Sequence, residues 1–255
     1  MKPVRQIPVA ALLLGACLVL ATVARAEESL TVHASFTPDR LGAVTNLSLT
    51  ASFLSGEANP PSPVTRVTLY APAGIEVDAL GAGTCAAAAL RQRGPSGCPA
   101  DSRAGFGGGI GVLTLPKEKV HATYTLDFFF APREDGRLRL LVYASSRAPI
   151  GVELVLIAKQ IPAPRPYGLG FSVEVPPIST FPGAPNASIE SAFVTIGAPN
   201  VAYYELIRGR KRLVHIRGIV MPKKCPAGGF PTEGIVDLAD GTALTVNSTI
   251  PCPLS

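Results

Sequence analysis

Seven cationic side chains gather between residues 208 and 224, the densest set of residues in the chain that could bind a ligand. They are Arg208, Arg210, Lys211, Arg212, Arg217, Lys223 and Lys224, with no carboxylate between Glu205 and Glu233. Cations bind polyanions by neutralising phosphates, so an anionic cell-envelope polymer, such as teichoic acid, or lipid headgroups are candidate partners. The alternative, a solvated hairpin with Arg208-Gly209-Arg210-Lys211-Arg212 as its turn, is favoured on sequence alone. We expect no nucleic-acid partner.

Asp127 is the candidate for acid–base chemistry. It is the one carboxylate in the apolar stretch 120–130, and alternation places it on the same strand face as His121. Opposite a second carboxylate or histidine, it could move protons in a hydrolase. The sequence identifies no such partner, so a position on a solvated strand face is favoured.

Catalytic motifs are absent from the sequence: it has no G-x-S-x-G elbow, no HExxH and no phosphate-binding loop. His33, His121 and His215 are far apart, and isolated surface or half-buried positions are expected for them. The glycine run 105–111 misses the spacing of a dinucleotide fingerprint and predicts instead a crowded strand that other backbones approach closely. We therefore assign no catalytic residue, metal or cofactor.

Four of the five cysteines, those that follow residue 26, fall into two pairs that are local in sequence. Cys85 and Cys98 are 13 residues apart, and Cys225 and Cys252 are 27 apart. An even number of cysteines in an oxidising compartment predicts two disulfides, one within each pair. Zinc binding is the alternative, which the absence of a Cys-x-x-Cys motif disfavours.

Residues 1–26 predict export from the cytoplasm. Lys2 and Arg5 precede a long uncharged stretch that ends at Ala24-Arg25-Ala26, as in a signal peptide cleaved after Ala26. The mature chain is then secreted or held at the cell surface, with no membrane span. A lipobox at Leu14-Gly15-Ala16-Cys17, which would lipidate Cys17, and an uncleaved membrane helix are the alternatives. Apolar sequence continues past Cys17, which favours cleavage after Ala26.

Composition places the chain among proteins rich in strands and turns, because it has 25 Gly, 25 Pro and only 16% charged residues. Removing residues 1–26 lowers the count of Lys and Arg from 23 to 20 against 18 acidic residues, a net charge of +2. The remaining length suits one large β domain or two immunoglobulin-sized ones.

Apolar and polar residues alternate in 45–53, 120–130, 138–142 and 171–175, which predicts strands with one buried and one solvated face. In 152–158 only Glu153 is polar, which predicts a central strand covered on both sides. The one predicted helix runs from Ala86 to Arg91.

Asp240-Gly241 predicts a two-residue primed turn in a hairpin over 235–246. In that register Cys252 lies opposite Gly229, which brings it near Cys225. The proline-rich segment 162–166 is a candidate lobe boundary. Together these signals predict an all-β chain over 27–255, built as one large β-sandwich or as two tightly joined immunoglobulin-like lobes, with one short helix.

Short motifs spread over most of the mature chain add a resemblance. They are Pro38-Asp39-Arg40-Leu41-Gly42 with Thr45-Asn46-Leu47, Pro72-Ala73-Gly74, Cys85 with Leu90, Cys98-Pro99, Ser102 and Gly105, Cys225-Pro226-Ala227-Gly228-Gly229-Phe230, Asp240-Gly241, and Pro251-Cys252-Pro253. In these the chain resembles a group of uncharacterised exported proteins of high-GC Gram-positive bacteria, in which aromatic residues often stand where this chain has Val236 and Leu238. The resemblance implies export and β structure and brings no known activity.

The function expected from the sequence is a non-catalytic structural or binding role at the cell envelope. An extracellular hydrolase of unrecognised type, using Asp127, is the alternative. Oligomeric state and ligand stay open.

Overall fold

The computed structural model of the protein describes residues 28–55, 60–79, 81–115, 118–179, 186–197, 202–215 and 218–253. The predicted signal peptide, its cleavage site and Cys17 lie outside these ranges. Within them, no helix has the length and apolar character needed to cross a membrane.

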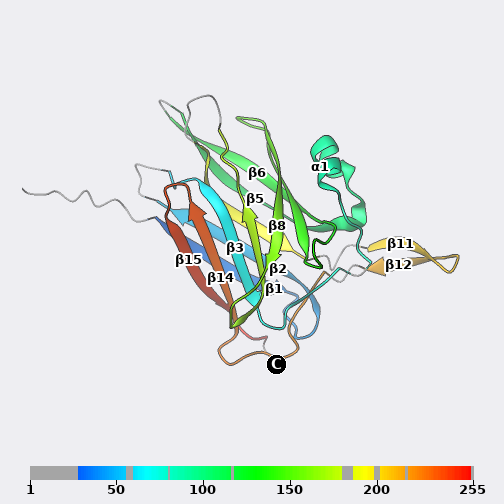
Figure 1. Ribbon diagram of the computed structural model, residues 1–255. Coiled ribbons are helices and arrows are strands. Elements are labelled where there is room, and N and C mark those ends of the chain that lie inside the picture. Colours follow the sequence, from blue (N-terminus) through cyan, green and yellow to red (C-terminus); the bar gives the residue numbers. More distant parts are fainter. Residues whose placement is uncertain are drawn as a thin grey trace, which may run out of the picture.

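Fifteen strands, one α-helix and two short 3-10 helices form in the described ranges (Figure 1). The strands are β1 (Ser29–Thr37), β2 (Val44–Leu54), β3 (Val64–Pro72), β4 (Glu76–Asp78), β5 (Arg103–Thr114), β6 (Lys119–Phe130), β7 (Arg139–Ser146), β8 (Val152–Ile161), β9 (Tyr167–Glu174), β10 (Ser188–Ile196), β11 (Ala202–Ile207), β12 (Arg210–His215), β13 (Gly218–Val220), β14 (Phe230–Leu238) and β15 (Ala243–Ile250). The helices are α1 (Ala87–Arg93), η1 (Gly94–Gly97) and η2 (Ala100–Ser102).

Thirteen of these strands belong to one antiparallel sheet. Its main path runs β15-β14-β3-β9-β8-β7-β6-β5-β10-β2, and β1 adds to the far side of β2. The two ends of this path meet, because β1 lies alongside β15. The sheet therefore curls back on itself, so that β14, β3 and β8 face β1, β2 and β5 across an interior (Figure 1).

One end of the interior is tightly packed. Phe36, Met221 and Phe230 meet there, and the Phe36 and Phe230 rings contact edge to face at a centroid distance of 5.8 Å. The short strands β13 and β4 continue the sheet beside the start of β2 and bring Ile219 into the same cluster. We call this cluster the packed end.

The helix α1 covers part of the outside of the sheet. Leu90 of α1 is fully buried against an outward-facing apolar cluster that includes Phe129, Leu141 and Tyr143, with Val155 and Ile157 of β8 beside it. β8 thus has apolar neighbours on both faces, as its near-continuous apolar sequence predicts.

The all-β prediction is confirmed, and the predicted strands lie within β2, β6, β7, β8 and β9, although β7 begins one residue after Leu138 and β9 ends at Glu174, before Val175. The arrangement differs from two separate sandwich sheets, because one hydrogen-bonded sheet supplies both facing layers. β8 and β9, which flank the proline-rich segment 162–166, pair directly with each other.

The predicted hairpin forms between β14 and β15, but the predicted register is wrong by one residue. Val236 pairs with Leu244, and the Leu238 N–H donates to the Thr242 carbonyl at 2.8 Å, which leaves a three-residue loop. Gly241 alone of the Asp240-Gly241 pair has a positive φ, of 88°. A two-residue type I′ turn, which Asp-Gly favours, needs two positive φ angles, whereas a three-residue loop needs one, which glycine supplies.

Candidate functional site: an apolar cavity inside the sheet

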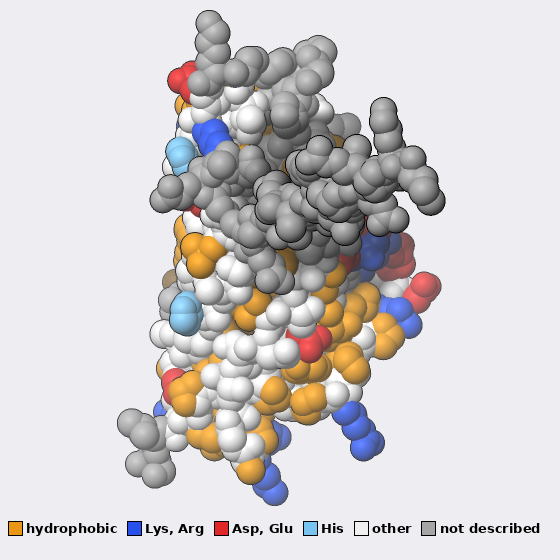
Figure 2. Space-filling model, turned by 90° about the vertical axis from the view of Figure 1, so that its left-hand side faces the viewer, with side chains coloured by type: hydrophobic (Ala, Val, Ile, Leu, Met, Phe, Trp, Pro, Cys, Tyr) orange, Lys and Arg blue, Asp and Glu red, His pale blue; other side chains and the backbone are white. Residues whose placement is uncertain are grey.

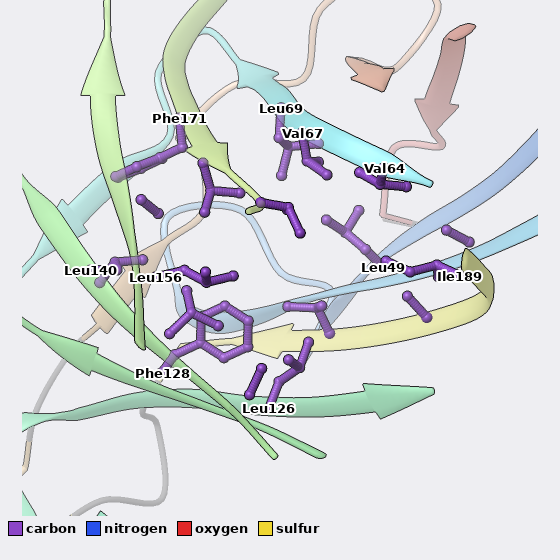
Figure 3. Close-up of a pocket in the computed structure, with 18 of the residues that line it drawn as sticks. Leu49, Val64, Val67, Leu69, Leu126, Phe128, Leu140, Leu156, Phe171 and Ile189 are labelled. Atoms are coloured by element: carbon purple, nitrogen blue, oxygen red, sulfur yellow. The ribbon is translucent and has the colours of Figure 1, made fainter. Parts of the chain in front are cut away.

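The interior of the curled sheet holds a cavity of about 410 Å³ beyond the packed end. Figure 3 shows Val67 and Leu69 of β3 and Phe171 of β9 on one side, with Leu126 and Phe128 of β6 on the other. Their side chains point into the space between the layers. The volume falls within the range of small-molecule pockets in proteins.

The cavity walls are almost entirely hydrocarbon. Val32, Leu49, Ala51, Leu154 and Leu156 all line it, and none of the described lining residues carries a charged side chain. These inward-facing side chains are only partly buried, whereas Leu47, which lines the same cavity where it meets the packed end, is 5% exposed. The apolar alternation of these strands therefore leads to an incompletely filled interior.

Glycines in β5 make room for the one phenol of the cavity wall. A Cβ atom at Gly109 would overlap the main-chain carbonyl of Ser191 and lie 2.8 Å from Cζ of Tyr124. Tyr124, directly opposite Gly109 in the ladder, donates its hydroxyl to the Ser191 carbonyl at 2.9 Å. Burial raises the pKa of the Tyr124 hydroxyl. The prediction that the glycine run is a crowded strand is confirmed.

Asp127 lies on the outer face of the sheet and does not line the cavity. Its carboxylate pairs with Arg103 of β5, and its side chain is 20% exposed. His121 lies six residues along the same strand, a distance of about 20 Å at the usual strand rise. The structure therefore does not bring Asp127 and His121 together as an acid–base pair.

The histidines are separate from one another in the described ranges. The His121 Nδ1 contacts a Glu190 carboxylate oxygen at 2.8 Å on the outer surface, and His33 is exposed on β1. His215 is the last residue of β12. Nowhere in the described part of the chain do three histidine, cysteine or acidic side chains gather as metal ligands would.

Both predicted disulfides are confirmed. Cys85 is bonded to Cys98 and Cys225 to Cys252, with Cα–Cα distances of 5.0 and 5.8 Å. The first links Cys85, two residues before α1, to Cys98, which lies between η1 and η2. The second joins the chain leaving the packed end to the end of β15, where Cys252 lies opposite Gly228, by extension of the observed register, instead of the predicted Gly229.

The structure divides the seven cations between two places. Arg208, Arg210, Lys211 and Arg212 lie on the β11–β12 hairpin, which projects from the curled sheet (Figure 1). Lys223 and Lys224 are exposed beside the packed end, where the Pro222 carbonyl accepts a hydrogen bond from Gly42. Arg217 lies outside the described residues. On the face in Figure 2, Lys and Arg side chains lie apart from one another among polar and apolar ones.

The predicted hairpin in the cationic segment is present, with a shorter turn than expected. Arg208 and Gly209 form the turn with φ angles of 51° and 76°, and Arg210 already begins β12. Two positive φ angles are the geometry of a primed two-residue turn, which matches strand twist.

The cavity is the candidate site that sequence reasoning missed. Each lining strand predicts an inward face, but no single strand indicates whether opposing faces meet. One signal was present: small residues recur on the inward faces, as at Ala51 of β2, Ala192 of β10 and Ala122 of β6. Ala51 and Ala192 are direct ladder partners, so both sides of that pair contribute little volume.

Comparison with known proteins adds no relative: no protein-family model, curated protein or solved structure matches the chain. The functional argument therefore depends on the geometry of the molecule itself.

Proposed function

We propose that the protein is a non-catalytic binding protein that holds an apolar ligand inside the curled sheet. The single observation that carries this proposal is the cavity of about 410 Å³ with walls of Leu, Val, Phe and Ala side chains. The ligand portion inside the cavity is uncharged, because no described lining residue offers a counter-charge.

Energetics support a ligand over an empty interior. Voids made in protein cores cost roughly 24 cal/mol per Å³, so an empty space of this size would cost on the order of 10 kcal/mol, about the net stability of a domain. Water is a poor substitute because the walls provide few hydrogen-bond partners. A hydrocarbon chain or ring system removes both penalties, and each buried methylene contributes about 0.8 kcal/mol.

The hydrolase alternative has less support. Asp127 is paired with Arg103 on the outer face, and the cavity contributes no carboxylate, histidine or charged group from its described lining. A hydrolase needs convergent polar groups around a reacting bond.

The setting we propose is the cell exterior or cell surface. The predicted signal peptide supports it, and two disulfides persist best in an oxidising compartment. Mass spectrometry of protein from its host tests this: Glu27 as the first residue supports free secretion, and an intact residue 1–26 segment on cytoplasmic protein contradicts export.

Ligand binding is tested with Nile red, an uncharged dye whose emission rises and shifts to the blue in apolar surroundings. We expect saturable binding at one site and displacement by a long-chain alcohol. Ala51→Phe adds a phenyl ring to the cavity wall and should weaken binding at least tenfold, because the ring occupies ligand volume.

Two variants serve as controls for that experiment. Thr50→Phe adds the same ring to the exposed face of β2 and should bind dye like the wild type. Leu206→Ser removes an exposed apolar side chain and so controls for dye bound at the surface, and it should also have no effect. Equal binding by Ala51→Phe and Thr50→Phe, with both folded, would overturn the proposal.

A further inference from the structure

The β11–β12 hairpin exposes large apolar side chains that no other element covers in the described structure. Tyr204, Leu206 and Leu213 are 63%, 75% and 51% exposed. Tyr204 pairs with Leu213, and Leu206 pairs with Lys211, so these four residues share one face of the two-stranded ribbon. An apolar face of this kind is unusual on a projecting element unless it contacts another phase or partner.

Cations lie at the turn and on both faces of this ribbon: Lys211 shares the apolar face, whereas Arg210 and Arg212 belong to the opposite face. Arg208, Arg210 and Arg212 are exposed on the turn and on β12, and Lys211 lies with its Nζ 4.4 Å from the centre of the Tyr204 ring. The hairpin also has an acidic residue, Glu205, opposite Arg212. Four cations against one carboxylate leave a net charge of +3 on the ribbon, if His215 is neutral.

We propose that the β11–β12 hairpin binds the surface of an anionic lipid bilayer. Its apolar face, with Lys211, enters the interfacial layer, and the long arginine side chains of the turn and of the opposite face extend past the ribbon to lipid phosphates. A soluble polyanion would use the cations but leave Leu206 and Leu213 in water, whereas a lipid surface accommodates both features. This inference is independent of the cavity and of its ligand.

Binding is tested by sedimenting the purified protein with vesicles of phosphatidylcholine containing phosphatidylglycerol. We expect Arg210→Glu/Arg212→Glu to weaken partitioning at least about twentyfold, because each basic residue near an anionic surface is worth about 1 kcal/mol. Lys223→Glu/Lys224→Glu makes the same change in net charge beside the packed end and should reduce partitioning far less. Equal losses in the two double variants would overturn the proposal, since they would reflect net charge alone.

The apolar contribution separates a membrane from an anionic polymer. Leu206→Ser should weaken vesicle binding several-fold while leaving binding to soluble polyphosphate unchanged. All variants carry the same N-terminal segment, so differences between them report on the hairpin. If Leu206→Ser binds vesicles as well as the wild type does, the partner is a polyanion and the membrane proposal is wrong.

Tryptophan fluorescence provides a second readout that needs no loss of binding. The chain has no Trp, so Leu206→Trp places a single reporter on the hairpin. Its emission should shift to the blue when anionic vesicles are added, as the indole leaves water. Phe193→Trp, at a 46% exposed position on β10, is the matched control and should show no shift. A shift in the control but not at position 206 would place the lipid contact elsewhere and refute the proposal.

Discussion

The packed end and the cavity of the curled sheet share strands β1, β2, β3 and β14, yet only the packed end is filled. On β2, Leu47 borders the cavity from the packed end and is 5% exposed, because Phe36 and Met221 pack there. Leu49, two residues further along the same face, also lines the cavity but is only partly buried. At the packed end, β13 and the segment after it add side chains from outside the main ladder. Around the cavity, the described strands form the walls, and no additional described segment adds side chains to its interior.

This difference teaches that inward-facing hydrophobicity and core packing are separate properties. A sheet with many strands encloses a wider space than side chains from its own walls can fill. Extra elements, or a ligand, must then occupy the remainder. The packed end therefore contributes core packing that does not depend on a ligand, and the cavity is available for binding.

The largest expected effect comes from comparing the same truncation in the two regions. Phe230→Ala should destabilise the protein by about 3–5 kcal/mol, because Phe230 is fully buried in the packed end. Phe171→Ala should cost less than half as much, since Phe171 is only partly buried and borders the cavity. Urea unfolding of both variants without ligand measures the difference. Equal losses would mean that the cavity walls are packed as tightly as the other end.

Removing each disulfide compares the two regions again, with a slightly smaller expected loss of stability. Cys225→Ala/Cys252→Ala opens the loop beside the packed end, and Cys85→Ala/Cys98→Ala opens the loop that holds α1 outside β8. Chain entropy predicts losses of about 3.5 and about 3 kcal/mol. Unfolding midpoints of the two double variants test this. Peptide mapping that shows four free thiols in the native protein would contradict both bonds.

Local sequence patterns predict the strands, the short helix and both disulfides, because alternation and cysteine spacing are local properties. Thr45–Phe53 is an example, since its apolar set points inward in β2 as predicted. The predicted hairpin register is wrong at Asp240-Gly241, because this dipeptide fits loops of two or of three residues. The choice depends on pairing with β3 as well as on the turn.

Properties that depend on distant strands could not be predicted. Arg103 is the partner of Asp127 only because β5 pairs with β6, and a bulge between Arg103 and Gly105 interrupts that register. The seven cations lie close together in the sequence. The β11–β12 hairpin ends before Lys223, so Lys223 and Lys224 lie apart from the hairpin cations in the structure. The cavity depends on the closure of the whole sheet.

The smallest predicted effect concerns Tyr124, whose phenol lies in the cavity wall. Tyr124→Phe should cost about 1 kcal/mol at pH 8, because the Ser191 carbonyl loses its hydrogen-bond donor. Burial raises the pKa of Tyr124 in the folded protein, whereas the unfolded chain ionises it at about pH 10. Above pH 10 the unfolded state therefore holds fewer protons, and wild-type stability falls with rising pH by up to about 1.4 kcal/mol per unit from this group.

Tyr124→Phe cannot lose stability in this way, so its deficit should shrink between pH 8 and pH 11. Burial also raises the pKa values of Tyr143 and Tyr167, so stability falls with rising pH in both proteins. The informative quantity is therefore the difference in stability between the wild type and Tyr124→Phe at each pH. Urea unfolding at the two pH values measures it. Parallel pH profiles would mean that water reaches the Tyr124 hydroxyl, and hence that the cavity is hydrated at that wall when no apolar ligand is bound.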